Sequence, residues 1–302
     1  MPVLDERIRP REAEEPFQKR RTAAMFPACV NPHCTSGWLH LWRSRSSPVI
    51  ESGWSCSPGC TRVWVAELVQ RERMGHSQRA AMHRHRVPIG LVLLTERWIS
   101  HSDLRKGLDA QRAGASVRIG AWLMEHCGLE ERRITQALGI QWNCPILTIG
   151  RDHKTPEMSL VPRIFLETFG ILPLRLSGTG VLYVAFEDRI DHSLTLSIER
   201  MTGLRVEAGL VSCSEFLRAQ KSILAARFPR TRLVEASSTE AIVDALTAIV
   251  EKEKPLQARI VRVHGFYWLR LWSKSLRGSS ADTHVLSSND IQDVVCSLAR
   301  FQ

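Results

Sequence analysis

The sequence predicts an α+β, multi-domain protein. Its expected parts are a small four-cysteine module, a tandem helix-turn-helix bundle followed by a small α/β unit, and a C-terminal helix-hairpin-helix unit. Three observations support this fold class. Two close pairs of cysteines stand near the N-terminus, one pattern is written twice in the middle, and short strand-like runs alternate with helical stretches after it. At 302 residues, the chain is long enough for two or three such units, each with its own core.

The charge balance is strongly basic, with 41 Lys plus Arg against 31 Asp plus Glu. Most of these cations are arginine, which suits forked contacts to phosphate groups and guanine edges better than lysine does. A nucleotide or nucleic-acid partner agrees with this composition, and so does a plain basic surface. Charge alone does not separate the two.

The N-terminal residues mix both charge signs and lack the apolar stretch of a signal peptide. No apolar run approaches the roughly 18 residues that a membrane span needs. We therefore expect a cytoplasmic protein with no membrane insertion, in which cysteines stay reduced.

Composition shifts divide the chain into consecutive segments with distinct expected structures. They are a disordered N-terminus (1–25), a treble-clef-like cysteine module (26–75), a basic linker (76–86), a tandem-motif helical subdomain (87–145), an α/β subdomain (146–228) and a small α+β C-terminal unit (232–302).

Four of the eight cysteines form two close pairs in the N-terminal module. Cys29 and Cys34 are spaced C-x4-C, and Cys56 and Cys60 are spaced C-x3-C. Each pair spans a tight turn, and the gap between the pairs has room for a hairpin. Such an arrangement of cysteines is typical of a four-thiolate zinc site. Four thiolates leave no open coordination position, so the zinc would be structural and not catalytic.

The residues around the cysteines strengthen this interpretation. Turn residues lie within both pairs, residues 37–44 and 49–56 read as flanking strands, and a helix begins after Cys60. The order knuckle, hairpin, knuckle, helix resembles a treble-clef zinc finger. A module of this size gains folding energy from a metal. The alternative is four buried free cysteines that act as small hydrophobic side chains. We treat His33 as a surface residue, and we expect the isolated cysteines to fill the core: Cys127, Cys144, Cys213 and Cys296.

The repeated pattern aligns with itself at an offset of thirty residues and needs no gap. The aligned pairs are Ile89/Ile119, Gly90/Gly120, Leu93/Leu123, Leu104/Ile134, Leu108/Leu138 and Gln111/Gln141. Each copy predicts a helix-turn-helix, because its later apolar residues are spaced i,i+4. Ser100 with Asp103 resembles a capping box, and Gly128 fits a left-handed helix end.

Some residues of the repeat do not serve a simple amphipathic helix. Gly90 and Gly120 stand near helix starts, where alanine forms a better helix, and they permit close approach of another group. Gln111 and Gln141 are amides that read a purine edge with paired donor and acceptor atoms. Arg118 precedes the second copy and suits a guanine edge or a phosphate.

The copy "RIGAWLMEHCGLEERRITQALGIQW" (118–142) and its earlier partner resemble a known tandem motif, R-[IL]-G-x-x-L-[LM]-x-x-x-G-[LI]-x-x-x-x-[LI]-x-x-x-L-x-x-Q. This motif is typical of the MshE-type N-terminal domain, which precedes the ATPase of type II secretion and type IV pilus assembly motors. The segment 160–220, with its "GILPLRL" and "LYVAF" runs, is similar to the α/β half of that domain. The resemblance covers about residues 87–225.

In part of that family the domain binds cyclic di-GMP, so the resemblance implies a cyclic di-GMP site here. Copy one departs from the motif with Pro88 in place of Arg and Trp98 in place of Gly. Arg86 is a partial substitute, two residues out of register. The implied ligand residues are Arg118, Ile119, Gly120, Leu123 and Gln141 from copy two, and Ile89, Gly90, Leu93 and Gln111 from copy one.

No catalytic pattern stands out. The carboxylates of "EDRID" (187–191) lack a partner base nearby in sequence, and no G-x-x-x-x-G-K-[ST] loop is found. We expect a non-enzymatic regulatory or adaptor protein, with cyclic di-GMP and secretion or pilus machinery proteins as partners. The alternative is a zinc-dependent scaffold that binds protein or nucleic acid through the cysteine module and the basic residues 71–86. In that case the repeat is only a packing unit.

The C-terminal unit predicts a helix at 238–252, a hairpin over 257–272 that turns at Gly265, and a last helix at 288–301. The last helix is inferred from a Ser-Asn-Asp cap signal. This unit suggests no function.

Overall fold

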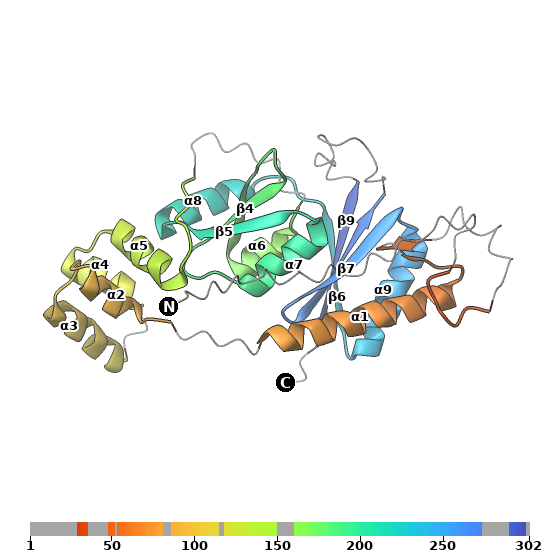
Figure 1. Cartoon of the computed structure of the whole chain (residues 1–302), viewed down its shortest axis with the longest axis horizontal. Helices are drawn as coiled ribbons and strands as arrows, with labels where there is room; N and C mark the ends of the chain where they lie inside the picture. The colour runs from red at the N-terminus through yellow and green to blue at the C-terminus, as the bar shows by residue number, and fades with distance from the viewer. Residues whose placement is uncertain are drawn as a thin grey trace, which may run out of the picture.

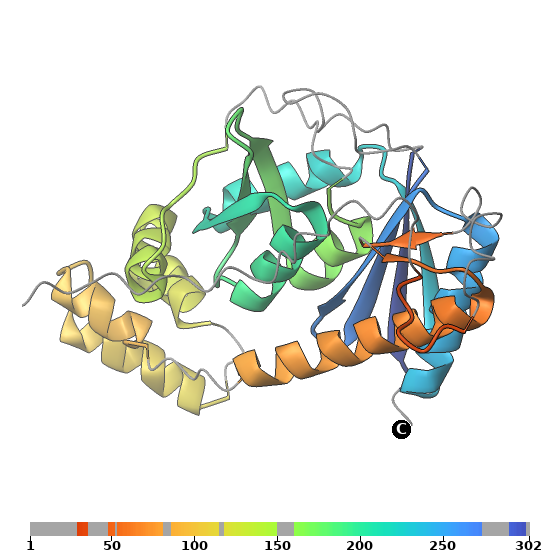
Figure 2. The ribbon, with the colours of Figure 1, turned by 45° about the vertical axis from the view of Figure 1, so that its right-hand side comes forward.

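A computed structural model of the chain describes residues 29–35, 48–51, 53–80, 86–114, 118–149, 160–273 and 290–299. A helical unit lies at one end of an elongated molecule and a large sheet at the other, with a small-sheet α/β unit between them (Figure 1; Figure 2). This confirms a mixed, multi-domain α+β fold.

The tandem repeat forms the helical unit, and each copy folds as helix-turn-helix as predicted. The helices are α2 (Ile89–Thr95) and α3 (His101–Arg112) in copy one, and α4 (Ile119–Cys127) and α5 (Glu131–Trp142) in copy two. The predicted capping box of Ser100 and Asp103 starts α3, and Gly128 ends α4 with a φ of 65°. Helix α2 packs on α5 and α3 packs on α4, so the two copies interlock.

The α/β unit follows directly. Its elements are α6 (Arg163–Phe169), β3 (Ile171–Leu176), β4 (Val181–Phe186), α7 (His192–Thr202), β5 (Arg205–Leu210) and α8 (Cys213–Leu224). Within the described residues, its three strands form the small sheet in the order β3-β4-β5. The predicted strand at 180–186 is confirmed as β4. Helix α7 makes the crossover between β4 and β5, which are parallel.

The large sheet combines strands from both ends of the chain. In the described part of the chain its order is β2-β1-β7-β8-β9-β6. The strands are β1 (Val49–Ile50), β2 (Gly53–Trp54), β6 (Arg230–Ala236), β7 (Gln257–Val263), β8 (Phe266–Trp272) and β9 (Ile291–Leu298). Ile50 pairs with Ala258, so the cysteine module shares a sheet with the C-terminal unit.

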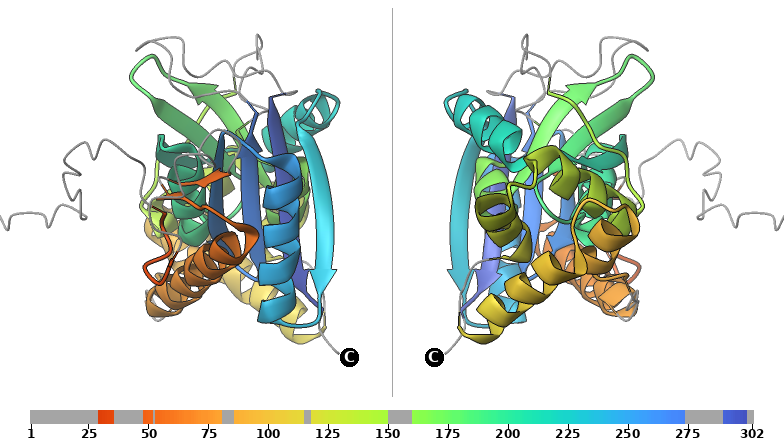
Figure 3. Two further views of the ribbon diagram at one scale, coloured as in Figure 1. Left: turned by 90° about the vertical axis from the view of Figure 1, so that its right-hand side faces the viewer. Right: turned by 90° about the vertical axis from the view of Figure 1, so that its left-hand side faces the viewer.

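Helices cover both faces of the large sheet. Helix α1 (Pro58–Ala80) and helix α9 (Thr239–Glu253) pack on one face, as Figure 3 shows for α9. The other face contributes Val261, Trp268 and Val295 to the core of the α/β unit. The large sheet and the α/β unit are therefore joined by one continuous hydrophobic core.

The predicted helix at 238–252 and the hairpin turned at Gly265 are confirmed by α9 and by the β7–β8 pair. The predicted last helix is wrong, because Ile291–Leu298 form strand β9. This strand pairs with β8 on one side and β6 on the other, and both of its faces are buried. A strand buried on both faces has no polar alternation, so local cap signals gave a misleading helix start.

The N-terminal expectations are met in part. The predicted strand at 49–56 is instead the tight β1–β2 hairpin, which turns at Glu51 with a φ of 56°. A helix does follow the second cysteine pair, but α1 already begins at Pro58 and continues to Ala80, into the expected linker. The expected disordered N-terminus, the strand at 37–44 and linker residues 81–85 lie outside the described residues.

A buried carboxylate fastens α1 to the centre of the molecule. The Glu72 side chain is 1% exposed. Its Oε2 accepts a hydrogen bond from Arg200 Nη1 of α7 at 2.8 Å and another from the Arg262 backbone N–H of β7 at 3.1 Å. These paired contacts offset the desolvation of the carboxylate and link α1 to both the α/β unit and the large sheet.

In the described part of the chain, no helix is both long and apolar enough to span a bilayer.

Candidate ligand and metal sites

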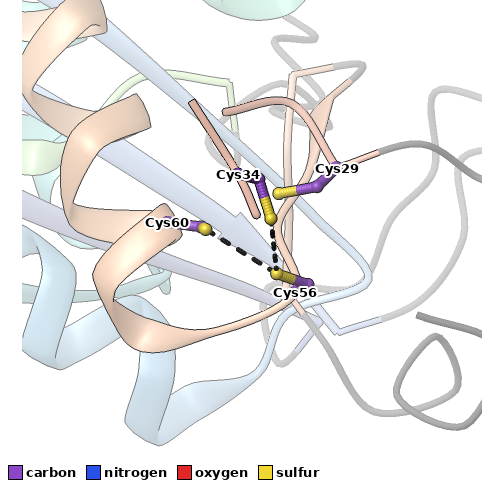
Figure 4. Close-up of side chains that lie close together, drawn as sticks. All are labelled: Cys29, Cys34, Cys56 and Cys60. Carbon is purple, nitrogen blue, oxygen red and sulfur yellow. Dashed lines mark hydrogen bonds between the residues drawn. The ribbon is translucent and has the colours of Figure 1, made fainter. Parts of the chain in front are cut away.

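The four predicted zinc cysteines converge on one point. Figure 4 shows the side chains of Cys29, Cys34, Cys56 and Cys60 directed toward a common centre. Their sulfur atoms all lie within 4.8 Å of one another, with Cys56 Sγ 3.4 Å from Cys34 Sγ and 3.6 Å from Cys60 Sγ. A tetrahedral zinc ion with Zn–S bonds of about 2.3 Å would separate the sulfur atoms by about 3.8 Å. The four sulfurs are thus placed to hold one metal ion.

Local structure fixes this cluster. Cys60 lies in the first turn of α1, so the start of this helix positions its side chain. Asn31 Nδ2 donates to Cys60 Sγ at 3.3 Å, and the Val30 N–H donates to the Trp54 carbonyl at 2.7 Å. His33 is exposed and lies outside the cluster, as expected. No disulfide joins any of the eight cysteines, all of which lie within the described residues. Burial raises the pKa of the Cys29 thiol to about 12, so a thiolate there needs a cation beside it.

The structure separates the nine predicted ligand residues by exposure. Gly90, Leu93, Gly120 and Leu123 lie in the core of the helical unit. Ile89, Ile119 and Gln141 are half-buried, and Arg118 and Gln111 are exposed. Only the half-buried residues and the exposed residues present atoms to a ligand without rearrangement of the core.

The two motif glycines make room for helix packing within their own copies. A Cβ on Gly90 would lie 2.7 Å from Leu104 Cδ1, and a Cβ on Gly120 would lie 3.2 Å from Ile134 Cγ2. Leu104 and Ile134 are equivalent positions of the repeat. The group that approaches each glycine is therefore an apolar side chain of the following helix, which explains why both copies keep the glycine.

The end of one copy meets the start of the other. Gln141, at the end of copy two, donates from Nε2 to the Val87 carbonyl, just before copy one, at 2.7 Å. On the other side, a Cβ on Gly107 of copy one would lie 3.5 Å from Ile119 Cγ1 of copy two. Gln111 follows Gly107 by four residues, so it lies on the same face of α3, one helical turn further along.

Arg118 is engaged by a carboxylate of the α/β unit. Its Nη1 lies 2.5 Å from Asp188 Oδ2, and the arginine side chain is 73% exposed. Asp188 belongs to the "EDRID" cluster (187–191), and the fold brings Arg118 to it from the start of α4. Sequence reasoning did not assign Asp188 to the site. The only signal was this cluster of acidic residues at a strand-to-helix turn.

A second contact places the helical unit against the α/β unit. Glu131 of α5 accepts hydrogen bonds from the backbone N–H and the Oγ of Ser214, at 2.8 and 2.6 Å. Ser214 stands in the first turn of α8, where a carboxylate also meets the helix dipole favourably. Two cavities border this region. One of about 630 Å³ includes Trp98 and Ile140, and one of about 390 Å³ includes Glu131, and neither is lined by a predicted ligand residue.

The connection after α5 adds backbone pairing to strand β5. The Leu147 N–H donates to the Leu210 carbonyl at 2.7 Å, and the Leu210 N–H donates to the Pro145 carbonyl at 3.0 Å. Gly209 is the residue that admits this segment. A Cβ there would lie 2.6 Å from Leu147 Cγ and 2.7 Å from the Pro145 carbonyl oxygen.

Gly209→Ala is therefore expected to lower the free energy of unfolding by roughly 1–3 kcal/mol, because backbone must shift to relieve the overlap. Urea denaturation followed by circular dichroism measures this change. The control is Gly178→Ala, because no heavy atom lies within 4 Å of a Cβ built at this exposed glycine. Equal stability of the two variants would show that residues 145–147 can shift away from the new side chain without a measurable loss of stability.

Comparison with known proteins assigns the central part of the chain. Residues 142–227 match the family described as the MshEN domain. The type IV pilus assembly ATPase PilB of Thermus thermophilus is 28% identical over 148 residues, which are 48% of this chain and 16% of PilB. This part of the chain is thus similar to the MshEN domain, which is related to the N-terminal domains of type II secretion and type IV pilus ATPases. The family match begins at Trp142, where the tandem helices end.

Two solved structures also match part of the chain. A structure of MshE with cdg is 21% identical and covers 46% of this chain and 99% of that one, with a TM-score of 0.39. The N-terminal domain of XpsE is 20% identical and covers 46% of this chain and 97% of that one, with a TM-score of 0.35.

Proposed function

We propose that this chain is a non-enzymatic, cytoplasmic regulatory or adaptor protein that binds cyclic di-GMP through its tandem helical unit. Its partners in this proposal are proteins of type II secretion or type IV pilus machinery. The contacting side chains are Arg118, Gln111 and Gln141, supported by Ile89 and Ile119. In this account Gly90, Leu93, Gly120 and Leu123 shape the helix packing that holds the contacting residues in place.

The observation that carries this proposal is the interlocking of the two copies. Gln141 reaches the start of copy one, and Gln111 is the equivalent residue of copy one on α3, which packs on α4 of copy two, so we expect two similar corners. Each corner combines an amide side chain with the N-terminal end of a helix. Cyclic di-GMP has two identical guanosine halves joined by phosphates, so a pair of similar corners suits it. Amide and guanidinium groups are suited to guanine edges, and helix N-termini are suited to phosphate. A solved structure of MshE with cdg, which we take as cyclic di-GMP, agrees with this ligand.

We also propose that the four-cysteine cluster holds a structural zinc ion. Four cysteine sulfurs within 4.8 Å of one another are the donor set of a closed zinc site. Cys29 and Cys34 belong to the described segment 29–35, whereas Cys56 and Cys60 flank the start of α1. A zinc ion there would tie the N-terminal loop to α1 and the large sheet, and it would leave no position for a substrate.

The nucleotide proposal is tested with Arg118→Ala. Loss of one charged hydrogen-bonding group is expected to weaken cyclic di-GMP binding by roughly 10- to 100-fold. Equilibrium dialysis with labelled cyclic di-GMP measures the dissociation constant. Because the Arg118–Asp188 pair is exposed, the stability of the variant should change by at most about 1 kcal/mol.

The matched control is Arg105→Ala, which removes an exposed arginine from α3 of the same unit. It should bind as the wild type does. A similar loss of affinity in both variants would indicate that general positive charge, and not the motif arginine, attracts the nucleotide. That outcome would favour a nucleic-acid partner.

A further inference from the structure

Copy one lacks the motif arginine, but another arginine is held at the same corner. Pro88 occupies the residue before α2, the position that Arg118 occupies before α4. Two residues earlier, the Arg86 guanidinium stacks on the indole of Trp142, with Cζ 3.3 Å from the ring centroid. Trp142 follows Gln141, whose amide contacts the Val87 carbonyl. Residues 86–87 and 141–142 thus form one compact junction.

The two arginines are held in different ways. Arg118 pairs with the carboxylate of Asp188, and this contact uses the N–H edge of the Arg118 guanidinium. Arg86 lies over an aromatic face, a contact that uses the flat side of the guanidinium and leaves its N–H groups directed outward in the plane. The C-terminal end of α5 adds a favourable partial negative charge near this cation. A stacked arginine is therefore pre-positioned to donate forked hydrogen bonds to an anion or a guanine edge.

We infer that Arg86, positioned by Trp142, takes the place of the missing arginine in the copy-one corner of the cyclic di-GMP site. This inference rests on the proposed function and deepens it, because it keeps both corners of the site active. Arg86 is the contacting residue, and Trp142 is a positioning residue that acts through it. The competing explanation is that the stack only fixes the chain entering α2.

The test is a double-mutant cycle on the affinity for cyclic di-GMP. Arg86→Ala and Trp142→Ala are each expected to weaken binding on the order of tenfold. The double variant should bind no more weakly than either single variant, because Trp142 acts only through Arg86. Trp142→Phe keeps an aromatic face and should bind within about threefold of the wild type. Thermal melts accompany each titration, since Trp142 also packs against the core.

Arg133→Ala is the matched control, because the Arg133 Cζ lies over the Trp98 ring, 5.0 Å from its centroid. Arg133 is on the same helix as Trp142 but away from the motif ends. Its affinity should equal that of the wild type. If the wild type binds cyclic di-GMP, Arg118→Ala loses binding and Arg86→Ala does not, this inference alone is overturned. Multiplicative losses in the double variant would overturn the positioning role of Trp142. A wild type that does not bind would overturn both this inference and the proposed function.

Discussion

Asp293→Ala is expected to lower the free energy of unfolding by about 3–5 kcal/mol, because it leaves the buried guanidinium of Arg270 without its carboxylate partner. Asp293 is fully buried and Arg270 is 1% exposed. Arg270 Nε and Nη2 donate to the two carboxylate oxygens at 2.7 and 2.8 Å, and Trp268 Nε1 donates to the same carboxylate at 2.7 Å. Arg270 Nη1 also reaches the Leu160 carbonyl at 2.9 Å, so the group joins the large sheet to the α/β unit.

Guanidinium denaturation gives the stability of this variant, and Asp244→Ala is its control. Arg62 and Asp244 are also 2.7 Å apart, but both are more than half exposed. That substitution should cost at most about 1 kcal/mol. Arg270→Met combined with Asp293→Leu should be more stable than Asp293→Ala alone, because no charge is left buried. If Asp293→Ala costs no more than Asp244→Ala, burial does not govern the strength of this pair.

The second large effect is expected from Cys56→Ser. Cys56 Sγ is the sulfur that neighbours both Cys34 and Cys60, so its loss removes a central ligand. Zinc content should fall from about one ion per chain to none, and the melting temperature should fall sharply, because metal binding contributes to folding of a small site. Chelation of the wild type should reproduce the effect.

Metal analysis and thermal melts measure both consequences. Cys127→Ser removes a half-buried cysteine of the helical unit and should keep the zinc. The site would be ruled out if the wild type, purified from zinc-containing medium, holds no metal and still melts cooperatively. In that case the four cysteines would be small hydrophobic side chains of the local cluster with Trp54.

Local signals predicted much of the fold. The thirty-residue repeat predicted paired helix-turn-helix units, and the Ser100 capping box and the Gly128 helix end are found where expected. These features depend on contacts within a few residues, so the sequence records them directly. The cysteine spacings likewise predicted a cluster that the fold assembles.

Long-range pairing was beyond reach of such signals. Strand β9 resembled a capped helix because its apolar run has no period of two, and only its place between β8 and β6 explains that pattern. The pairing of Ile50 with Ala258 joins residues far apart in the chain, and no local propensity encodes it.

The candidate ligand site shows the same division. The motif predicted a set of ligand residues, but not that Gly90 and Gly120 face the side chains of Leu104 and Ile134. It also gave no sign that Asp188 meets Arg118 or that Arg86 stacks on Trp142. Those contacts arise where separate elements meet, so they follow from packing and not from spacing.

Calorimetric titration of the whole chain tests the central claim most directly. Cyclic di-GMP, cyclic di-AMP and GTP are each titrated into wild-type protein at two salt concentrations. The account predicts saturable binding of cyclic di-GMP, much weaker binding of the other two nucleotides, and only a modest effect of salt. Absence of heat with cyclic di-GMP at high protein concentration, or equal binding of all three nucleotides with a steep loss in salt, would contradict it.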